Sequence, residues 1–207
     1  ALSFLQQLGV TFPENPTFTD IGKAIAAVQE LMAEREIEDL LDLPEMKDGE
    51  KIAIMQTANS ILPATYICKP LLFPIFACLS VSLSIQYGNI SPSSYAYVSY
   101  GLILSNSANP DVITGGRFCQ LALKLVDKFD AKIDKAAVLA VSGLFLIHRT
   151  SPLRETRPLL QAAYTNGLET GSYEFAGYGG YNLGAYSFWC NHPLAPLAEE
   201  TRAYCHG

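Results

Sequence analysis

Apolar residues recur along this chain at steps of three and four positions far more often than at steps of two, which is the spacing of an amphipathic helix. The pattern predicts about ten helices and no strand, so we expect an all-α fold. Within residues 1–90, helices are expected at 1–8, from about 19 to 32, over 36–43, from 48 to about 62, and over 67–87.

The last third of the sequence repeats with a period of 41 residues. The pairs are Ser142-Gly143 with Leu183-Gly184, Pro152-Leu153 with Pro193-Leu194, and Ala162 with Ala203. A weaker copy, shifted by one residue in length, places Tyr100-Gly101 at the same point. Helical hairpins that cannot bury their apolar faces alone stack into an α-solenoid, and we predict a tetratricopeptide-like one. Residues 91–207 would supply three hairpins, 92–106 with 112–130, 132–149 with 152–169, and 172–190 with 194–205, continuous with helical hairpins in 1–90.

Three glycines, Gly101, Gly143 and Gly184, stand in the middle of predicted helices. Each costs a helix about 1 kcal/mol relative to alanine. Close approach of a neighbouring helix would offset that cost through added dispersion contacts. We therefore predict that these glycines are close-packing positions.

Several helix starts carry capping signals. Thr19 or Asp20 is expected to cap the helix that follows, and Ser91 and Ser151 each precede a proline. A serine oxygen can accept from free amides, while proline at the first helical position has no amide to leave unpaired. The two Ser-Pro pairs thus predict helices that begin at about 92 and 152.

From Pro70 to Pro110 the chain has no charged residue and no histidine. The most apolar part, 71–87, has roughly 17 residues and is interrupted by Pro74 and several serines, whereas a spanning helix needs about 20 apolar residues. We favour a helix buried on most sides over a membrane span.

The charge distribution disfavours a nucleic-acid partner. Residues 1–50 hold eleven acidic and three basic side chains, a formal charge of −8, and the remainder carries about +2. Binding to phosphates needs a concentrated basic stripe, which the scattered lysines and arginines after Lys51 do not provide.

Candidate chemistry is sparse. The five cysteines, Cys68, Cys78, Cys119, Cys190 and Cys205, lack the spacing of a zinc site. Cys190 and His192 could form a thiol and base pair, but at a helix end before Pro193 a capping role is the better interpretation. Gly177, Gly179 and Gly180 follow no strand, as a nucleotide-binding loop would require. The sequence predicts no catalytic residue, no metal ligand and no cofactor.

The densest aromatic cluster, between 173 and 189, is the one candidate for recognition. Tyr178, Tyr181, Tyr186 and Trp189 would suit a partner-binding surface on the concave face of a solenoid. A core role for most of these side chains is the alternative.

Five short runs resemble one family. They are Leu41-Asp42-Leu43-Pro44-Glu45-Met46, Ser60-Ile61-Leu62-Pro63-Ala64, Gln120-Leu121-Ala122-Leu123-Lys124-Leu125, Gly167-Leu168-Glu169-Thr170-Gly171 and Glu174-Phe175-Ala176-Gly177-Tyr178. The sequence is similar to the helical region that follows the AAA-type ATPase in bacterial multi-sensor signal-transduction multi-kinases. Those proteins join a serine/threonine kinase, the ATPase, the tetratricopeptide-like region, a GAF domain and a histidine kinase.

The resemblance implies a non-catalytic segment of a larger cytoplasmic kinase. None of the five runs is catalytic, so no active-site residue is implied for this sequence. Its partners would be protein segments or flanking domains of the same polypeptide. The alternatives are a freestanding protein-binding solenoid and a small thiol enzyme that uses Cys190 and His192.

Overall fold

A computed structural model describes the backbone of residues 1–206 and the side chains as far as Tyr204. This part of the chain is all-α, as the apolar spacing predicts, and an isolated bridge between Glu45 and Asn89 is the only strand-like pairing in it. The α-helices are α1 (Leu2–Gln7), α2 (Phe18–Leu31), α3 (Gly49–Cys68), α4 (Leu72–Tyr87), α5 (Ser93–Ser105), α6 (Val112–Lys128), α7 (Lys132–Val141), α8 (Arg157–Thr170), α9 (Tyr173–Trp189) and α10 (Leu194–His206).

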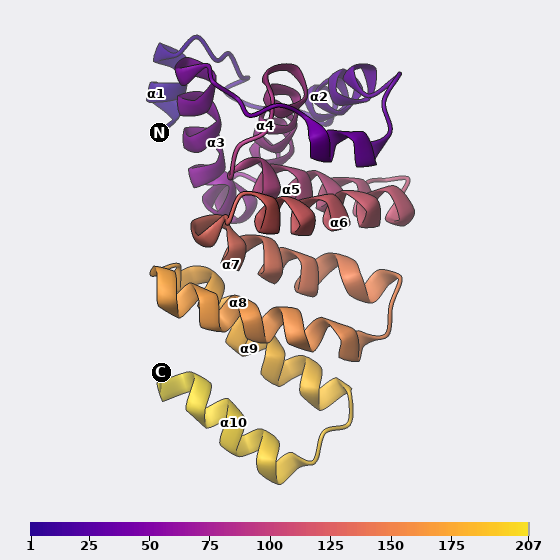
Figure 1. The fold of residues 1–207 in the computed structure, drawn as a ribbon, viewed down its shortest axis with the longest axis vertical. Coiled ribbons are helices and arrows are strands. Elements are labelled where there is room, and N and C mark those ends of the chain that lie inside the picture. The colour runs from indigo at the N-terminus through magenta and orange to yellow at the C-terminus, as the bar shows by residue number, and fades with distance from the viewer. Residues whose placement is uncertain (207) are drawn as a thin grey trace.

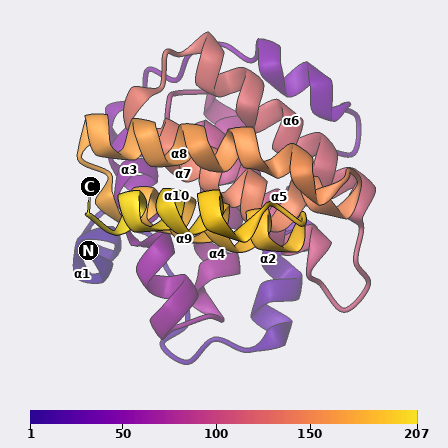
Figure 2. The same cartoon turned by 90° about the horizontal axis from the view of Figure 1, so that it is seen from below.

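Helices α1–α4 lie together at one end of the molecule, and α5 to α10 follow in chain order along its long axis (Figure 1). Helix α5 packs most extensively on α6, α7 on α8, and α9 on both α8 and α10. Seen along that axis, the C-terminal helices overlie the N-terminal ones (Figure 2). The first helices of the three hairpins, α5, α7 and α9, also contact one another in succession, as expected for a solenoid of helical hairpins.

The uncharged stretch forms the two central helices. Ten of the sixteen residues of α4 and all thirteen residues of α5 are buried. The buried serines Ser84 and Ser93 bond to each other at 2.9 Å, which satisfies part of their polarity inside the core. Within residues 1–206, none of the helices combines the length and the apolarity that crossing a bilayer requires.

Three helix boundaries in the N-terminal part differ from the prediction, and one is the helix expected over 67–87, which starts only at Leu72 because α3 runs on to Cys68. The cap of α2 is Thr17, not Thr19 or Asp20, because Thr17 and Asp20 bond reciprocally in a capping box. Helix α3 continues through Pro63 to Cys68 instead of ending near Leu62. Burial of Leu62 and Thr65 on its inner face stabilises these extra turns although Pro63 cannot donate a backbone hydrogen bond.

The Ser-Pro pairs also act differently from the prediction. Helix α5 begins at Ser93, and the Ser91 hydroxyl donates to Asp134 instead of capping the helix. After Ser151, a 3₁₀ turn over Leu153–Thr156 precedes α8, which starts at Arg157. Pro158 then falls in the first turn of α8, where a missing amide costs nothing.

The helix expected over 132–149 is regular only as far as Val141. A π-helical turn, Ser142–Leu146, and a 3₁₀ turn, Ile147–Arg149, complete it. Arg149 bonds the Ser105 carbonyl and the Asn106 side chain, and so ties this end to the end of α5. π-Helical turns widen a helix locally and often occur at functional sites.

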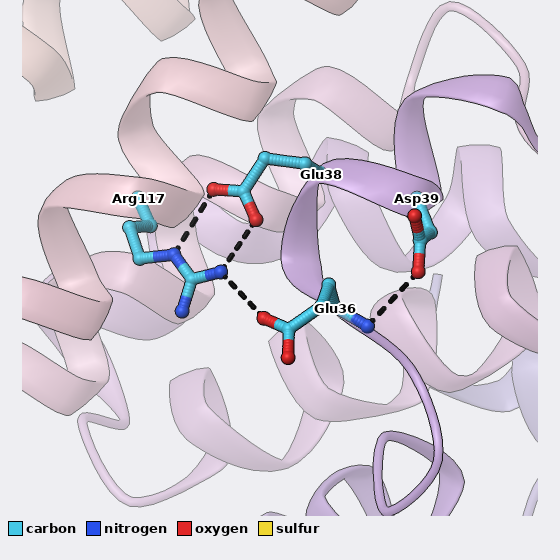
Figure 3. Close-up of polar contacts among 4 residues, drawn as sticks. All are labelled: Glu36, Glu38, Asp39 and Arg117. Carbon is cyan, nitrogen blue, oxygen red and sulfur yellow. Dashed lines mark hydrogen bonds and ion pairs between the residues drawn. The ribbon is translucent and has the colours of Figure 1, made fainter.

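Two basic side chains of α6, Arg117 and Lys128, bind the acidic N-terminal part, and Lys128 donates to the Leu41 carbonyl at 2.6 Å. Arg117 on α6 pairs with Glu38 and with Glu36, at 2.8 Å, at the 3₁₀ turn Ile37–Asp42 (Figure 3). The Glu36 amide is in turn bound by Asp39, at 3.1 Å. The hydrogen bond from Arg117 is the main reason that the pKa of Glu38 is lowered to about 2.

Candidate partner-binding groove

An apolar hollow of about 140 Å³ opens between α3, α5, α7 and α9. The last turns of α3 and the start of α4 close one end, and the π-helical turn after α7 contributes one wall. Its lining residues are Pro63, Tyr66, Ile67, Phe73, Tyr95, Ser99, Leu102, Ala140, Val141, Leu144, Phe145, Glu174, Phe175 and Tyr178. The unexpected extension of α3 therefore builds part of this hollow.

Aromatic rings form its walls. Tyr66 lies edge-on to Phe73, with centroids 5.2 Å apart, and 6.2 Å from Phe145. On the other side, Phe175 lies 5.8 Å from Tyr95 and 6.0 Å from Tyr178. Such edge-to-face pairs hold their rings in defined positions, so the hollow is largely formed before any partner arrives.

A wider, more polar hollow of about 670 Å³ adjoins the first. The two share Pro63, Tyr95, Glu174 and Phe175, and together we call them the inner groove. The polar hollow is further lined by α3, by the residues before α5, by the turn between α6 and α7, and by the first turn of α7. The polar residues from these segments are Asn59, Ser91, Asp130, Lys132 and Asp134.

Equivalent positions of successive first helices face the inner groove. Tyr95, Ala137 and Tyr178 are spaced by the repeat, and all three line it. Ser99 with Val141, and Leu102 with Leu144, follow at four and seven positions further along each helix. Because residues at i, i+4 and i+7 share one helical face, the first two hairpins add the same stripe to the groove, and the third adds Tyr178 at the first of these positions.

Asp134 is the most unusual group in the groove. It lies in the first turn of α7 and accepts a hydrogen bond of 2.5 Å from Ser91. Burial raises its pKa, and the Ser91 bond only partly opposes that effect. Tyr95 lies nearby: burial raises the pKa of its hydroxyl, and the charges of Glu174 and Asp134 raise it further. Sequence analysis did not identify Asp134, Glu174 or Phe175 as groove residues.

The four aromatic residues predicted to bind a partner do not form one surface. Tyr178 lines the inner groove, and its hydroxyl bonds Glu174 at 3.2 Å. Tyr186 packs back on the π-helical turn after α7, where its hydroxyl donates to the Leu144 carbonyl at 3.0 Å. Tyr181 and Trp189 are 78% and 73% exposed and line neither hollow. The groove therefore uses one of the four directly.

The three mid-helix glycines all face the second helix of their own hairpin. A Cβ at Gly101 would stand 2.7 Å from the Gly115 carbonyl oxygen and 3.3 Å from Phe118. At Gly143 it would stand 2.9 Å from Leu160, and at Gly184 3.3 Å from Thr201. The contact is tightest at Gly101, against backbone, and loosest at Gly184.

Cys190, Asn191 and His192 end α9 in a Schellman motif. Asn191 has a φ of 61°, its amide donates to the Phe188 carbonyl, and the His192 amide donates to that of Ser187. The His192 ring nitrogen Nε2 lies 2.7 Å from Arg157 Nη1, and a guanidinium can only donate. That lone pair is thus engaged by Arg157. The side chain of Cys205 lies outside the described residues.

Within the described residues, no three His, Cys, Asp or Glu side chains gather where they could hold a metal ion. His148 packs edge-on to Tyr186, with centroids 6.2 Å apart, and burial lowers its pKa. Comparison with known proteins gave no match to a family model, to a curated protein or to a solved structure.

Proposed function

We propose that this chain is a non-catalytic helical-repeat scaffold whose inner groove binds a segment of another protein or of a flanking domain in the same polypeptide. The observation that carries the proposal is the inner groove, to which three successive first helices contribute Tyr95, Ala137 and Tyr178 at equivalent positions. Solenoids present such continuous inner faces to extended or helical partners.

Exposed apolar side chains at the rim would supply binding energy. Ile67 is 63% exposed and Tyr66 is 46% exposed at the end of α3. Complete burial of a side chain of this size contributes about 1.5–3 kcal/mol, so a few such contacts support a weak and reversible complex.

A selection experiment tests this proposal. A random 16-residue peptide library would be selected against the protein and then tested against Ile67→Asp. The control is Ile113→Asp on α6, where the isoleucine is 70% exposed and outside both hollows. We expect enriched peptides to lose binding to the first variant and keep it with the second. Peptides that bind both variants as well as the parent would overturn the proposal.

We further propose that the segment acts in a cytoplasmic signal-transduction kinase, where it connects an ATPase and a sensor domain. The resemblance of the five sequence runs to the multi-kinase family supports this context. A small change in solenoid curvature, or capture of a flanking segment, would alter how the neighbouring domains meet. An immunoblot of source cells tests it: the native polypeptide should be many times longer than 207 residues. A native polypeptide of only 207 residues would refute this context and leave a freestanding scaffold.

A further inference from the structure

The polar part of the inner groove presents hydrogen-bond acceptors that lack donors. Asn59 is 6% exposed, and its Nδ2 donates to the Pro92 carbonyl at 2.7 Å. A carbonyl can only accept, so this bond settles which side-chain atom is nitrogen. The other atom, Oδ1, is buried and has no partner among the described residues, and Asn59 is one of the residues that line the hollow. Buried acceptors of this kind are rare in folded proteins because each carries a desolvation penalty.

Two carboxylates line the same hollow, and neither forms an ion pair among the described residues. Asp134 accepts only from the Ser91 hydroxyl, and Glu174 only from Tyr178, among the described residues. Lys132, the nearest basic residue in sequence to Asp134 on its N-terminal side, pairs with Asp130 at 3.4 Å instead. Both carboxylates line the same polar hollow as Tyr95, and their charges raise the pKa of the Tyr95 hydroxyl. Asp134 is half-buried and Glu174 is exposed, and a half-buried carboxylate without a paired cation is unfavourable until a positive charge reaches it.

The apolar hollow begins at the same residues. Tyr95, Phe175 and Glu174 line both hollows, so an apolar side chain in one and a cation in the other would come from one short segment. Ser99, 1% exposed, adds a buried hydroxyl without a partner among the described residues at the apolar end. The aromatic faces of Tyr95 and Phe175 add a favourable surface for a cation.

We propose that the partner in the inner groove is a peptide segment that places a lysine or arginine side chain beside a large apolar one. This inference rests on the proposed function and names the chemistry of the partner. The cation donates to the side-chain oxygen Oδ1 of Asn59 and to the carboxylates of Asp134 and Glu174. The apolar neighbour of that cation enters between Tyr66, Phe145 and Phe175. Ammonium and guanidinium groups carry only donors, which matches a set of acceptors.

The library selection tests the two proposals separately. Among the peptides that no longer bind the Ile67→Asp variant, we expect enrichment of lysine and arginine next to aromatic or aliphatic residues. Groove-dependent peptides without that enrichment would overturn the inference and leave the scaffold function standing. If no peptide depends on Ile67, both proposals fail.

One enriched peptide then provides a quantitative test. Replacing its basic residue by glutamine should weaken binding to the parent protein about tenfold, the loss expected for a charged hydrogen bond left unmade. The double variant Asp134→Asn/Glu174→Gln should bind the enriched peptide and its glutamine-substituted form equally. The control Asp127→Asn/Glu169→Gln removes the same charge from exposed positions outside both hollows and should keep the tenfold preference. Loss of the preference in the control, or its survival in Asp134→Asn/Glu174→Gln, would contradict the inference.

Discussion

Gly143 lies directly against Leu160, so that a Cβ added to the glycine would stand 2.9 Å from Cδ2 and 3.1 Å from Cγ of the leucine. The repeat carries this relationship along the solenoid. Gly101 faces Phe118 one repeat earlier, and Gly184 faces Thr201 one repeat later, at equivalent positions. The recurrent glycine therefore marks a point of close contact between the two helices of each hairpin.

A double-mutant cycle measures this contact. Gly143→Ala should destabilise the protein by about 1–3 kcal/mol, because the added methyl group overpacks against Leu160. Leu160→Ala alone should cost about 2–5 kcal/mol, since Leu160 is fully buried. In the double variant the alanine methyl fills part of the space that the leucine leaves. The loss in the free energy of unfolding of the double variant, measured by urea denaturation, should be smaller than the sum of the losses of the two single variants. Strict additivity of those losses would show that the two side chains do not compete for space.

The Arg117 clamp predicts an acid-sensitive stabilisation. The pKa of Glu38 is lowered to about 2 from 4.5, first by its hydrogen bond from Arg117. Because the folded pKa lies below the unfolded one, the stabilisation is present above pH 4.5 and is lost as pH falls towards 2. In Arg117→Gln, the Glu38 pKa measured by NMR should return towards its ordinary value. Arg202→Gln, at an exposed position on α10, is the control and should leave it lowered.

Asp134 should have the opposite effect on stability. Burial raises its pKa above the ordinary 3.8, so the folded state holds the proton more tightly than the unfolded state. Stability contributed by this group is present below pH 3.8 and is lost as pH rises through the folded pKa. Ser91 is its donor, and Glu174 adds a second negative charge near Tyr95.

Replacing the carboxylate tests that sign. Asp134→Asn keeps an oxygen for Ser91 and should raise the Tm at pH 7, with the gain shrinking below pH 3.8. Asp127→Asn on the exposed face of α6 should change the Tm little at either pH. A lower Tm for Asp134→Asn at pH 7 would mean that the charged form is favoured in the fold.

Cys190 should show ordinary thiol reactivity. A catalytic pair would need His192 to take the thiol proton, but Arg157 engages its Nε2 lone pair and the residues form a helix cap. We expect iodoacetamide to label Cys190 no faster than free cysteine at neutral pH. Faster labelling, abolished by His192→Gln, would revive the thiol-enzyme alternative.

Much of the architecture follows from local pattern. Apolar spacing predicted the helices, and the 41-residue repeat predicted where each hairpin turns, because helix formation and turn chemistry depend on nearby residues. The errors lie at helix ends: the capping role predicted for Ser91, the start of α8, and the continuation of α3 through Pro63. There tertiary contacts, including the bond from Ser91 to Asp134, outweigh the local capping preference.

The inner groove likewise depends partly on local sequence pattern and partly on tertiary contacts. Combining the repeat with the helical period would have aligned Tyr95, Ala137 and Tyr178 on one face, so their shared direction was available in the sequence. Pattern alone could not bring Asn59 and Ser91 to Asp134 or Phe73 to Tyr66, since such contacts depend on how helices distant in sequence cross. The sequence by itself determined an all-α chain of repeated hairpins. Only the tertiary packing decided that these hairpins enclose an apolar groove beside unpaired acceptors, because burial and pairing are properties of the assembled helices.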